Sequence, residues 1–208
     1  MIKLKSYCQE LAILLFLIAL PRENVRGQEF NLGVFGGVAV SQVDGDYYRG
    51  YHKLGMTGGL FVNREIENNF YWQLELKYVA KGAFENEPNS SVYDKTVYHY
   101  IEIPISVNYL VNEKYQFDLG LSPEILLQYA AFDAHGKTNP SLYPPNNRFG
   151  LNAFAGISYW FLPRTAVGFR FTYSIIPFRD PKEWNSPQNR GLFHNVLAFT
   201  LAQKFKSR

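Results

Sequence analysis

The sequence predicts an all-β protein, an eight-stranded antiparallel transmembrane β-barrel. Polar and apolar residues alternate in eight separate segments, which is typical of strands with two unlike faces. Phe, Trp and Tyr make up 17% of the chain, a level that suits the aromatic girdles of a membrane barrel. The chain also begins with the layout of an exported protein. Together these observations favour a barrel whose apolar face meets lipid.

The first segment of the chain has the features of a signal peptide. Lys3 and Lys5 form a basic start, and residues 11–20 form an unbroken apolar run that Pro21 ends. A run of this length is too short for a membrane-spanning helix, which needs about 20 residues. Small residues follow near positions 25–27, where a cleavage site is expected. The segment therefore predicts export.

Removal of this leader divides the chain into a signal peptide, residues 1–27, and one barrel domain, residues 28–208. Cys8, the only cysteine, lies in the leader, so the mature domain has neither a disulfide nor a thiolate site. Basic and acidic residues nearly balance in the remainder, and no basic patch indicates nucleic acid as a partner. We expect the cell outer membrane as the location and outer-membrane lipid as the partner.

The first four alternating segments are residues 29–42, 54–64, 69–82 and 97–111. Each sets bulky apolar residues on one face against small or polar residues on the other. The expected outward residues include Leu32, Val34, Val38, Leu54, Met56, Leu60, Leu74, Leu76, Ile101, Ile103, Ile105 and Val107. Pro104 cannot donate to a strand ladder, so the fourth segment is expected to contain a bulge or a register break there.

The last four segments are residues 115–131, 148–161, 165–176 and 192–205. Their expected outward residues include Phe117, Leu119, Leu121, Leu127, Tyr129, Ala155, Ile157, Phe169, Phe171, Leu197 and Phe199. Gln128 falls on the inward face of the first of them. Eight is an even number of strands, as in single-chain bacterial barrels, and it predicts that the first and last strands pair to close the barrel.

Connection lengths predict the orientation of the barrel. Short and long connections alternate along the chain: the short ones are 65–68, 112–114 and 162–164, and the long ones are 43–53, 83–96, 132–147 and 177–191. In outer-membrane barrels the long loops face outside and the short turns face the periplasm. A soluble lipocalin-like barrel is the alternative, but its apolar residues would point inward to a ligand.

The inward face carries charged residues of both signs. Alternation assigns four acids and four bases to it, namely Glu75, Glu102, Asp118, Glu124, Lys77, Lys81, Arg148 and Arg170. Charges in a narrow interior are costly unless they are paired, so equal numbers predict an internal ionic network. An eight-stranded barrel has an interior that side chains can fill, which argues against a solute-conducting pore.

No residue pattern predicts a catalytic, cofactor or metal site. None of the four histidines, His52, His99, His135 and His194, has metal-ligand spacing. One enzymatic alternative remains open, because His99 and His194 fall near the outer ends of their strands. Either histidine with Ser174 or Asp180 could form a site acting on lipid A or peptides. The main hypothesis is a non-enzymatic barrel.

Several motifs resemble the PorT-like outer-membrane β-barrel family of Bacteroidetes, which belongs to the porin family. Residues 100–105, YIEIPI, resemble its YxEIPL-type segment, and residues 33–38, 50–55 and 73–76 are similar to its opening strands. The resemblance covers residues 28–205. It implies an outer-membrane barrel with a structural or surface role, or a role as an accessory to secretion. The PorT branch is implicated in protease secretion, which would add secretion-system components as partners.

Overall fold

The computed structural model describes residues 30–45, 50–84, 95–133, 136–137, 147–179 and 191–205. These residues form ten β-strands: β1 (Asn31–Asp44), β2 (Lys53–Glu67), β3 (Phe70–Phe84), β4 (Lys95–Glu102), β5 (Ile105–Val111), β6 (Tyr115–Asp133), β7 (Gly136–Lys137), β8 (Phe149–Leu162), β9 (Thr165–Ser174) and β10 (Phe193–Lys204). None of the described residues forms a helix long and apolar enough to cross a membrane. The predicted leader lies outside the described residues.

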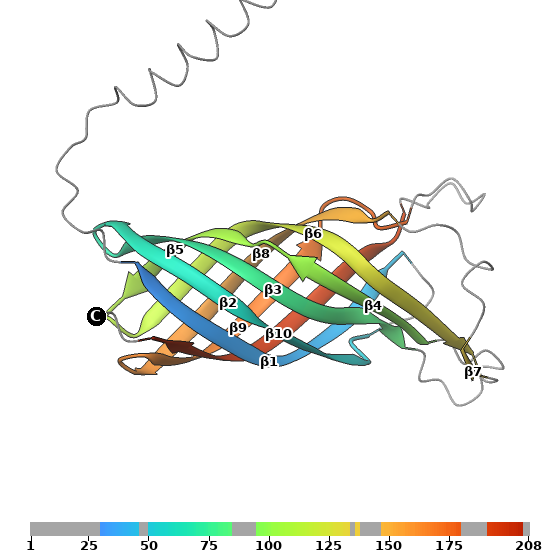
Figure 1. The fold of residues 1–208 in the computed structure, drawn as a ribbon, viewed down its shortest axis with the longest axis horizontal. Helices are drawn as coiled ribbons and strands as arrows, with labels where there is room; N and C mark the ends of the chain where they lie inside the picture. Colours follow the sequence, from blue (N-terminus) through green and yellow to red (C-terminus); the bar gives the residue numbers. More distant parts are fainter. Residues whose placement is uncertain are drawn as a thin grey trace, which may run out of the picture.

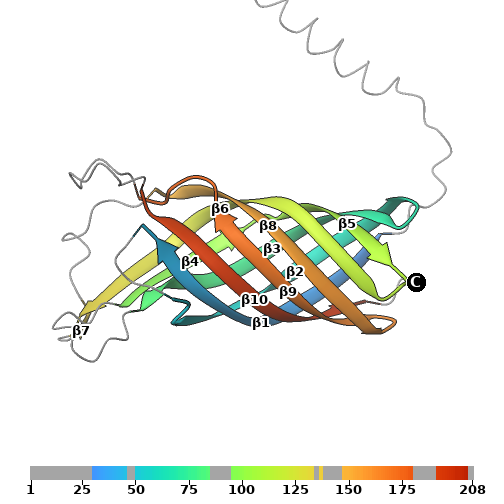
Figure 2. The same ribbon diagram turned by 180° about the vertical axis from the view of Figure 1, so that it is seen from behind.

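The strands close into one antiparallel barrel (Figures 1 and 2). β1 pairs with β10 on one side and with β2 on the other, and β2 in turn pairs with β3. β4 and β5 both lie between β3 and β6, so they are two pieces of one strand. β6, β8, β9 and β10 complete the ring. The predicted eight-stranded barrel, closed by its terminal strands, is therefore confirmed.

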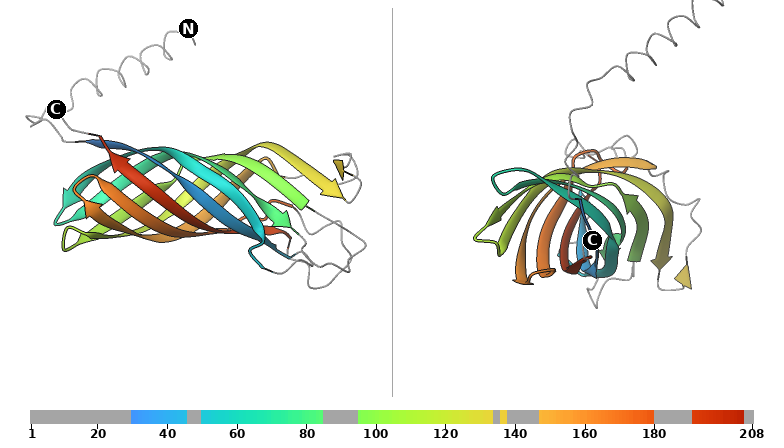
Figure 3. Two further views of the ribbon diagram at one scale, coloured as in Figure 1. Left: turned by 90° about the horizontal axis from the view of Figure 1, so that it is seen from below. Right: turned by 60° about the vertical axis from the view of Figure 1, so that its left-hand side comes forward.

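The two ends of the barrel differ in their connections. At one end, called the short-turn end, β2 meets β3 through Asn68 and Asn69, which have φ values of 47° and 70°. Asn112 and Glu113, in the three-residue link from β5 to β6, have the same left-handed conformation, which a type I′ turn requires at its two central positions. The opposite end is called the long-loop end. β6 and β7 reach furthest there, and the strands tilt around a common axis (Figures 1 and 3).

The fourth predicted strand is interrupted at Pro104, as expected. β4 ends at Glu102 and β5 begins at Ile105. The ladder continues across the break, because Ile103 donates its backbone N–H to Pro123 O at 2.9 Å and Pro104 O accepts from Glu75 N at 2.9 Å. Proline therefore removes one donor without opening the barrel wall.

A bulge in β6 reverses the predicted faces of two residues. Tyr100 of β4 pairs with Leu126 and His99 pairs with Gln128, so Leu127 is an extra residue in β6. One extra residue inverts the alternation beyond it. Gln128, predicted inside, is exposed, and Tyr129, predicted outside, stacks on Tyr98 inside the barrel at a centroid distance of 6.0 Å. The prediction was wrong at these two positions.

The remaining described strand residues follow the predicted division into two faces. Large apolar residues of every barrel strand are exposed on the outside, among them Leu54, Leu76, Ile105, Leu119, Ile157, Phe169 and Phe199. The interior holds most of the charged side chains of the strands, with an aromatic cluster at each end. Leu76 of β3 is 55% exposed, whereas its neighbour Glu75 is 3% exposed. Such an apolar exterior around a polar interior is the arrangement of a membrane barrel.

Candidate functional site

The charged residues of the interior form two layers. The upper layer, nearer the long-loop end, consists of Lys77, Lys81, Glu102 and Glu124. Lys81 Nζ lies 2.5 Å from Glu124 Oε2 and 3.4 Å from Glu102 Oε1, and Lys77 Nζ lies 2.8 Å from Glu102 Oε2. Each of these side chains is at most 5% exposed. Two bases therefore neutralise two acids in a region closed to solvent.

Neutral side chains complete the upper layer. Ser122 donates its hydroxyl to Glu102 at 3.2 Å, and the Asn152 amide donates to Glu124 at 2.6 Å. The Lys81 ammonium also lies over the Tyr100 ring, 4.4 Å from its centroid. These contacts give the buried charges additional partners, which a buried ion pair needs if it is to offset its desolvation.

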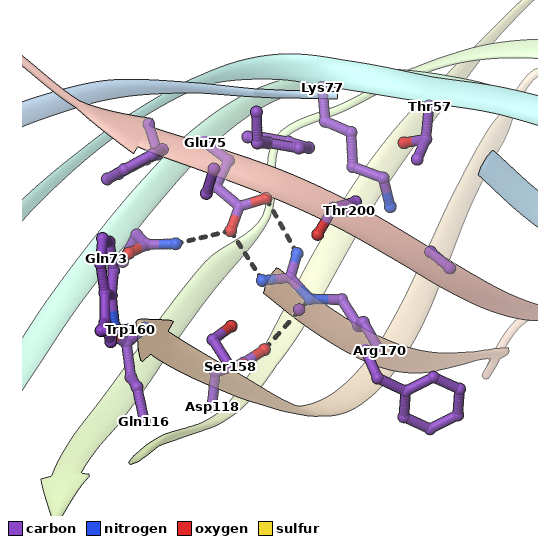
Figure 4. A pocket seen from close by; sticks show the side chains of 16 residues that line it. Thr57, Gln73, Glu75, Lys77, Gln116, Asp118, Ser158, Trp160, Arg170 and Thr200 are labelled. Atoms are coloured by element: carbon purple, nitrogen blue, oxygen red, sulfur yellow. Dashed lines mark hydrogen bonds and ion pairs between the residues drawn. The ribbon is translucent and has the colours of Figure 1, made fainter. Parts of the chain in front are cut away.

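The lower layer consists of Glu75, Asp118 and Arg170 (Figure 4). The Arg170 guanidinium donates through Nη1 and Nη2 to both oxygens of Glu75, at 2.9 and 2.8 Å, and through Nε to Asp118 at 3.0 Å. Such a two-pronged contact matches the planar fork of arginine to a carboxylate. Gln73 donates a further hydrogen bond to Glu75 at 2.7 Å. One cation thus holds two acids together.

Register explains how β6, β8 and β9 assemble this layer. Gly156 of β8 pairs with Asp118 on one side and with Arg170 on the other. A Cβ atom at Gly156 would lie 2.7 Å from Asp118 Oδ1. Glycine therefore leaves the space across which the two charged side chains meet. The Arg170 guanidinium also lies over the Phe154 ring, 4.4 Å from its centroid.

Arg148 is the one predicted member that lies elsewhere. It precedes β8 at the long-loop end, where its side chain is exposed, and it forms none of the ion pairs found among the described residues. The other seven predicted charges lie in the interior and contact one another. The two layers therefore contain four acids and three bases.

An aromatic cluster closes the interior at the long-loop end. It is called the long-loop plug and is formed by Tyr98, Tyr100, Tyr129, Phe178 and His194. The His194 ring stacks on the Phe178 ring with a centroid distance of 4.0 Å and an interplanar angle of 8°. Alternation alone predicts the inward direction of Tyr98 and Tyr100. Phe178 follows β9 in the connection to β10, so no strand pattern indicates its place.

A second cluster closes the short-turn end. Phe61 and Trp160 form its centre, and Phe35 and Leu110 pack against them. The Trp160 indole donates to Gln116 at 3.2 Å, and Lys204 Nζ lies 4.0 Å above the indole ring. This short-turn plug places a large aromatic side chain across the interior, with a cation stacked on it.

A cavity of about 50 Å³ lies beside the lower layer and is lined at its two ends by Lys77 of the upper layer and by Trp160 of the short-turn plug (Figure 4). Its lining includes Gln116, Ser158, Thr200 and Trp160, together with Arg170. A polar cavity of this volume has room for roughly three to five water molecules. Water in this cavity would solvate Asp118 and Arg170, which also line it. Side chains of the ion-pair layers and of the two plugs therefore surround this small chamber.

Among the described residues, the side chains of His99 and His194 contact tyrosine hydroxyls and neither a serine nor a carboxylate. His99 lies on the outer face, where Nδ1 is 2.6 Å from the Tyr78 hydroxyl, and His194 Nε2 is 3.3 Å from the Tyr100 hydroxyl. Ser174 instead accepts the backbone N–H of His194 at 3.1 Å. Asp180 and His135 lie outside the described residues, and His52 is exposed. The described residues contain no cluster of metal-ligating side chains.

The closed antiparallel barrel, its apolar exterior and its ion-paired interior define the class of outer-membrane β-barrel proteins. Residues 22–180 match the family described as the outer membrane protein beta-barrel domain. The chain therefore belongs to that family. No curated protein sequence matches the chain significantly.

Two solved structures have similar folds. One is Ail, the attachment invasion locus protein of Yersinia pestis, solved in complex with the heparin analogue sucrose octasulfate. It is 15% identical, with a TM-score of 0.50, and the match covers 85% of this chain and 99% of that one. Neisserial surface protein A is 12% identical, with a TM-score of 0.50 and coverage of 85% and 97%. At these identities the likeness concerns the fold alone.

Proposed function

We propose that this protein is a non-conducting, non-enzymatic outer-membrane barrel that acts through its long-loop end, as a surface protein or as an accessory to secretion. The observation that carries the proposal is the filled interior. Two plugs and two ion-pair layers follow one another along the barrel axis, and Lys81 and Glu102 in the upper layer are each 1% exposed. An interior of this kind leaves the exposed surfaces as the parts that can act.

The orientation follows from the connections. In outer-membrane barrels the long loops face outside, so the four longer connections of this chain would form its outer surface. The short turns at Asn68–Asn69 and at Asn112–Glu113 would then face the periplasm. On this placement the barrel domain begins and ends on the periplasmic side, and the predicted leader precedes it.

Conductance tests the first part of the proposal. The mature protein is inserted into planar lipid bilayers, and current steps are recorded in parallel with a wide general porin as the positive control. We expect no discrete steps, because a hydrated ion would have to break the Lys81–Glu124 and Arg170–Glu75 pairs. Regular open-channel steps from correctly folded protein would contradict a closed interior.

Complementation tests the second part. Cells that lack the protein receive either the parent gene or a variant in which residues 85–94 are replaced by a two-residue turn. We expect the variant to reach the membrane, and we expect surface-dependent phenotypes, such as the amount of protease released into the medium, to be lost. A third gene, carrying Gln73→Asn inside the barrel, serves as a control with an unchanged surface. If the loop variant restores every phenotype, this loop has no part in the function.

The resemblance to the PorT-like family is the support for the secretion role, because one branch of that family, PorT itself, is implicated in protease secretion. Residues 100–105 include the end of β4, the break at residues 103–104 and the first residue of β5. Glu102 within them forms ion pairs with both lysines of the upper layer. The motif therefore has a structural use in this chain, which any barrel with the same interior would share. Protease release in the complementation experiment distinguishes the secretion role from a purely structural one.

The enzymatic alternative has less support. It needs an imidazole bonded to a serine or carboxylate at the outer rim, whereas the described contacts of His99 and His194 are to tyrosine hydroxyls. Purified protein incubated with lipid A and with peptides tests it directly. A product whose formation depends on His194 or His99 would replace the proposal.

A further inference from the structure

The His194 side chain is the least satisfied polar group among the described residues. It is 1% exposed, and its Nδ1 atom is the only buried side-chain nitrogen or oxygen in the described part of the chain that lacks a hydrogen-bond partner. Its Nε2 atom contacts the Tyr100 hydroxyl at 3.3 Å. Unsatisfied buried polar groups are costly, so each one in a folded protein needs an explanation.

The imidazole is held between aromatic rings. Phe178 stacks on one face at 4.0 Å, and Tyr98 and Tyr100 approach its edges at 5.1 and 5.5 Å. Val43 of β1 is its register partner. None of these groups is a carboxylate, so a proton added to the ring would find no counter-charge in contact with it.

The charged and titratable groups around this cluster belong to three elements. They are Tyr98, Tyr100 and Glu102 of β4, Lys81 of β3, and Glu124 and Tyr129 of β6. Lys81 lies over the Tyr100 ring, whose hydroxyl contacts the imidazole, so its charge disfavours a positive ring. Both acids already hold Lys81 at 3.4 and 2.5 Å. Because these two acids are already paired with Lys81, a protonated His194 ring would be repelled by Lys81 without gaining an acid of its own.

Phe178 belongs to a strap that crosses the long-loop end. The strap consists of residues 175–179 and 191–192, and its two parts are joined by Phe178 N–H to Leu192 O at 2.9 Å and Leu192 N–H to Arg179 O at 3.2 Å. Asn147 anchors it through backbone and side-chain donations to Phe178 O and Pro177 O, at 2.7 and 3.0 Å. The Phe178 ring is buried in the long-loop plug, where it stacks on His194 and contacts Tyr98 at a centroid distance of 5.1 Å.

We propose that His194 is an acid-sensitive latch, which holds the strap in the mouth of the barrel while its ring is neutral and releases it when the ring takes up a proton. A neutral ring stacks on Phe178 with no cost of buried charge. A protonated ring would be a desolvated cation without a carboxylate partner, and its attraction to the aromatic faces is smaller than that penalty. The protonated ring is satisfied only after Phe178 withdraws and water enters.

Release would also reach the ion pairs below. The His194 backbone donates to Ser174, Ser174 donates to Asn152 at 2.9 Å, and Asn152 donates to Glu124. This chain of hydrogen bonds connects the latch to the upper layer. Water admitted at the mouth would meet Lys81 and Glu124 first, so the proposal concerns the outer end of the interior and leaves the lower layer in place.

The direction and size of the pH effect follow from linkage. A solvated imidazole titrates near pH 6.5, so the closed strap keeps its full stability above that value. Below it, each further pH unit favours the open strap about tenfold, because only the open form accepts the proton. Between pH 7.5 and pH 4.5 the opening equilibrium should therefore rise by about 100-fold.

Hydrogen exchange of the mature protein in lipid nanodiscs tests the latch. Rates are measured at pH 7.5 and 4.5 and normalised to the intrinsic rate at each pH. We expect the protection of the Asn147, Phe178 and Leu192 amides to fall by about 100-fold, while amides of central β3 keep theirs. His194→Gln should abolish this pH dependence, and His52→Gln and His99→Gln should retain it. Unchanged protection in the parent, or an undiminished pH response in His194→Gln, would overturn the proposal.

A second measurement covers the case in which His194→Gln does not fold. Nitrogen NMR of imidazole-labelled parent protein follows the charge of the His194 ring directly. The ring should become charged over the same pH interval in which the strap amides lose protection. A ring that becomes charged while the strap stays protected, or that stays neutral while protection is lost, would equally overturn the latch.

Discussion

Replacing Arg170 by methionine tests whether the ionic interior stabilises the barrel. The Arg170 guanidinium is the only cation in contact with Glu75 and Asp118 among the described ion pairs, and these two side chains are 2% and 4% exposed. Arg170→Met keeps an unbranched side chain but leaves two buried acids without their partner. Breaking a buried pair in this way costs about 3–5 kcal/mol.

The structure places the expected value at the lower end of that range. The Arg170 side chain is 18% exposed and lines the small chamber, where water can screen the remaining charges. We therefore expect the free energy of unfolding to fall by about 3 kcal/mol. Urea unfolding from lipid vesicles, followed by tryptophan fluorescence, measures this difference, since Trp160 lies in the same interior.

Two further variants make the measurement interpretable. Arg148→Met removes an exposed arginine that is in none of the described ion pairs, and it should change the free energy of unfolding by no more than about 0.5 kcal/mol. The triple variant adds Glu75→Gln and Asp118→Asn to Arg170→Met and so removes all three charges. It should recover most of the free energy of unfolding that Arg170→Met alone loses. If Arg170→Met is no more harmful than Arg148→Met, the network does not stabilise the barrel. If the triple variant stays as unstable as the single one, packing on Phe154 explains the loss instead.

Three other changes test the faces, the bulge and the short-turn plug. Leu76→Arg places a charge on the lipid face and should cost about 2–4 kcal/mol in vesicle refolding. Gln73→Arg should act through crowding and charge in the interior, where Gln73 contacts Glu75; the reverse result would indicate a soluble, inward-binding barrel. Deletion of Leu127 should leave the barrel folded, because it removes the extra residue of the bulge, whereas deletion of Leu121 from the regular ladder should prevent folding as judged by resistance to protease. Trp160→Ala should enlarge the chamber at the short-turn end without producing channel steps in bilayers, since both ion-pair layers remain; steps would assign the barrier to Trp160.

The sequence was sufficient to predict the fold, because a closed barrel imposes one rule on every strand. Lipid offers no partner for polar groups, so each strand must alternate and the terminal strands must pair. That rule alone places Leu74 and Leu76 outside the barrel, and Gln73 and Glu75 inside it. The same rule assigned Lys77 and Glu102 to the interior, although only the register of β3 with β4 makes them direct neighbours.

Arg148 shows where the rule ends. Alternation describes residues within a strand, and β8 begins at Phe149. One residue earlier the chain leaves the pleat, so its side chain is no longer bound to either face. The partner of each charged residue could not be predicted from the sequence either. The ion pair between Glu75 and Arg170 joins β3 to β9 across the lumen, and no local pattern indicates the distance between those strands.

Tyr129 gives the physical reason why the long-loop plug could not be derived. A single unpaired residue, Leu127, reverses every side chain that follows it in β6, and an apolar residue in that place looks the same as one in a regular strand. The reversal turns Tyr129 onto Tyr98, next to His194, and it brings Gln128 to the outer face beside His99. The bulge thus adds an aromatic ring to the plug and a polar side chain to the exterior in one step. Both effects occur where β4 and β6 approach the long-loop end, at which the exterior becomes polar and the aromatic cluster closes the interior.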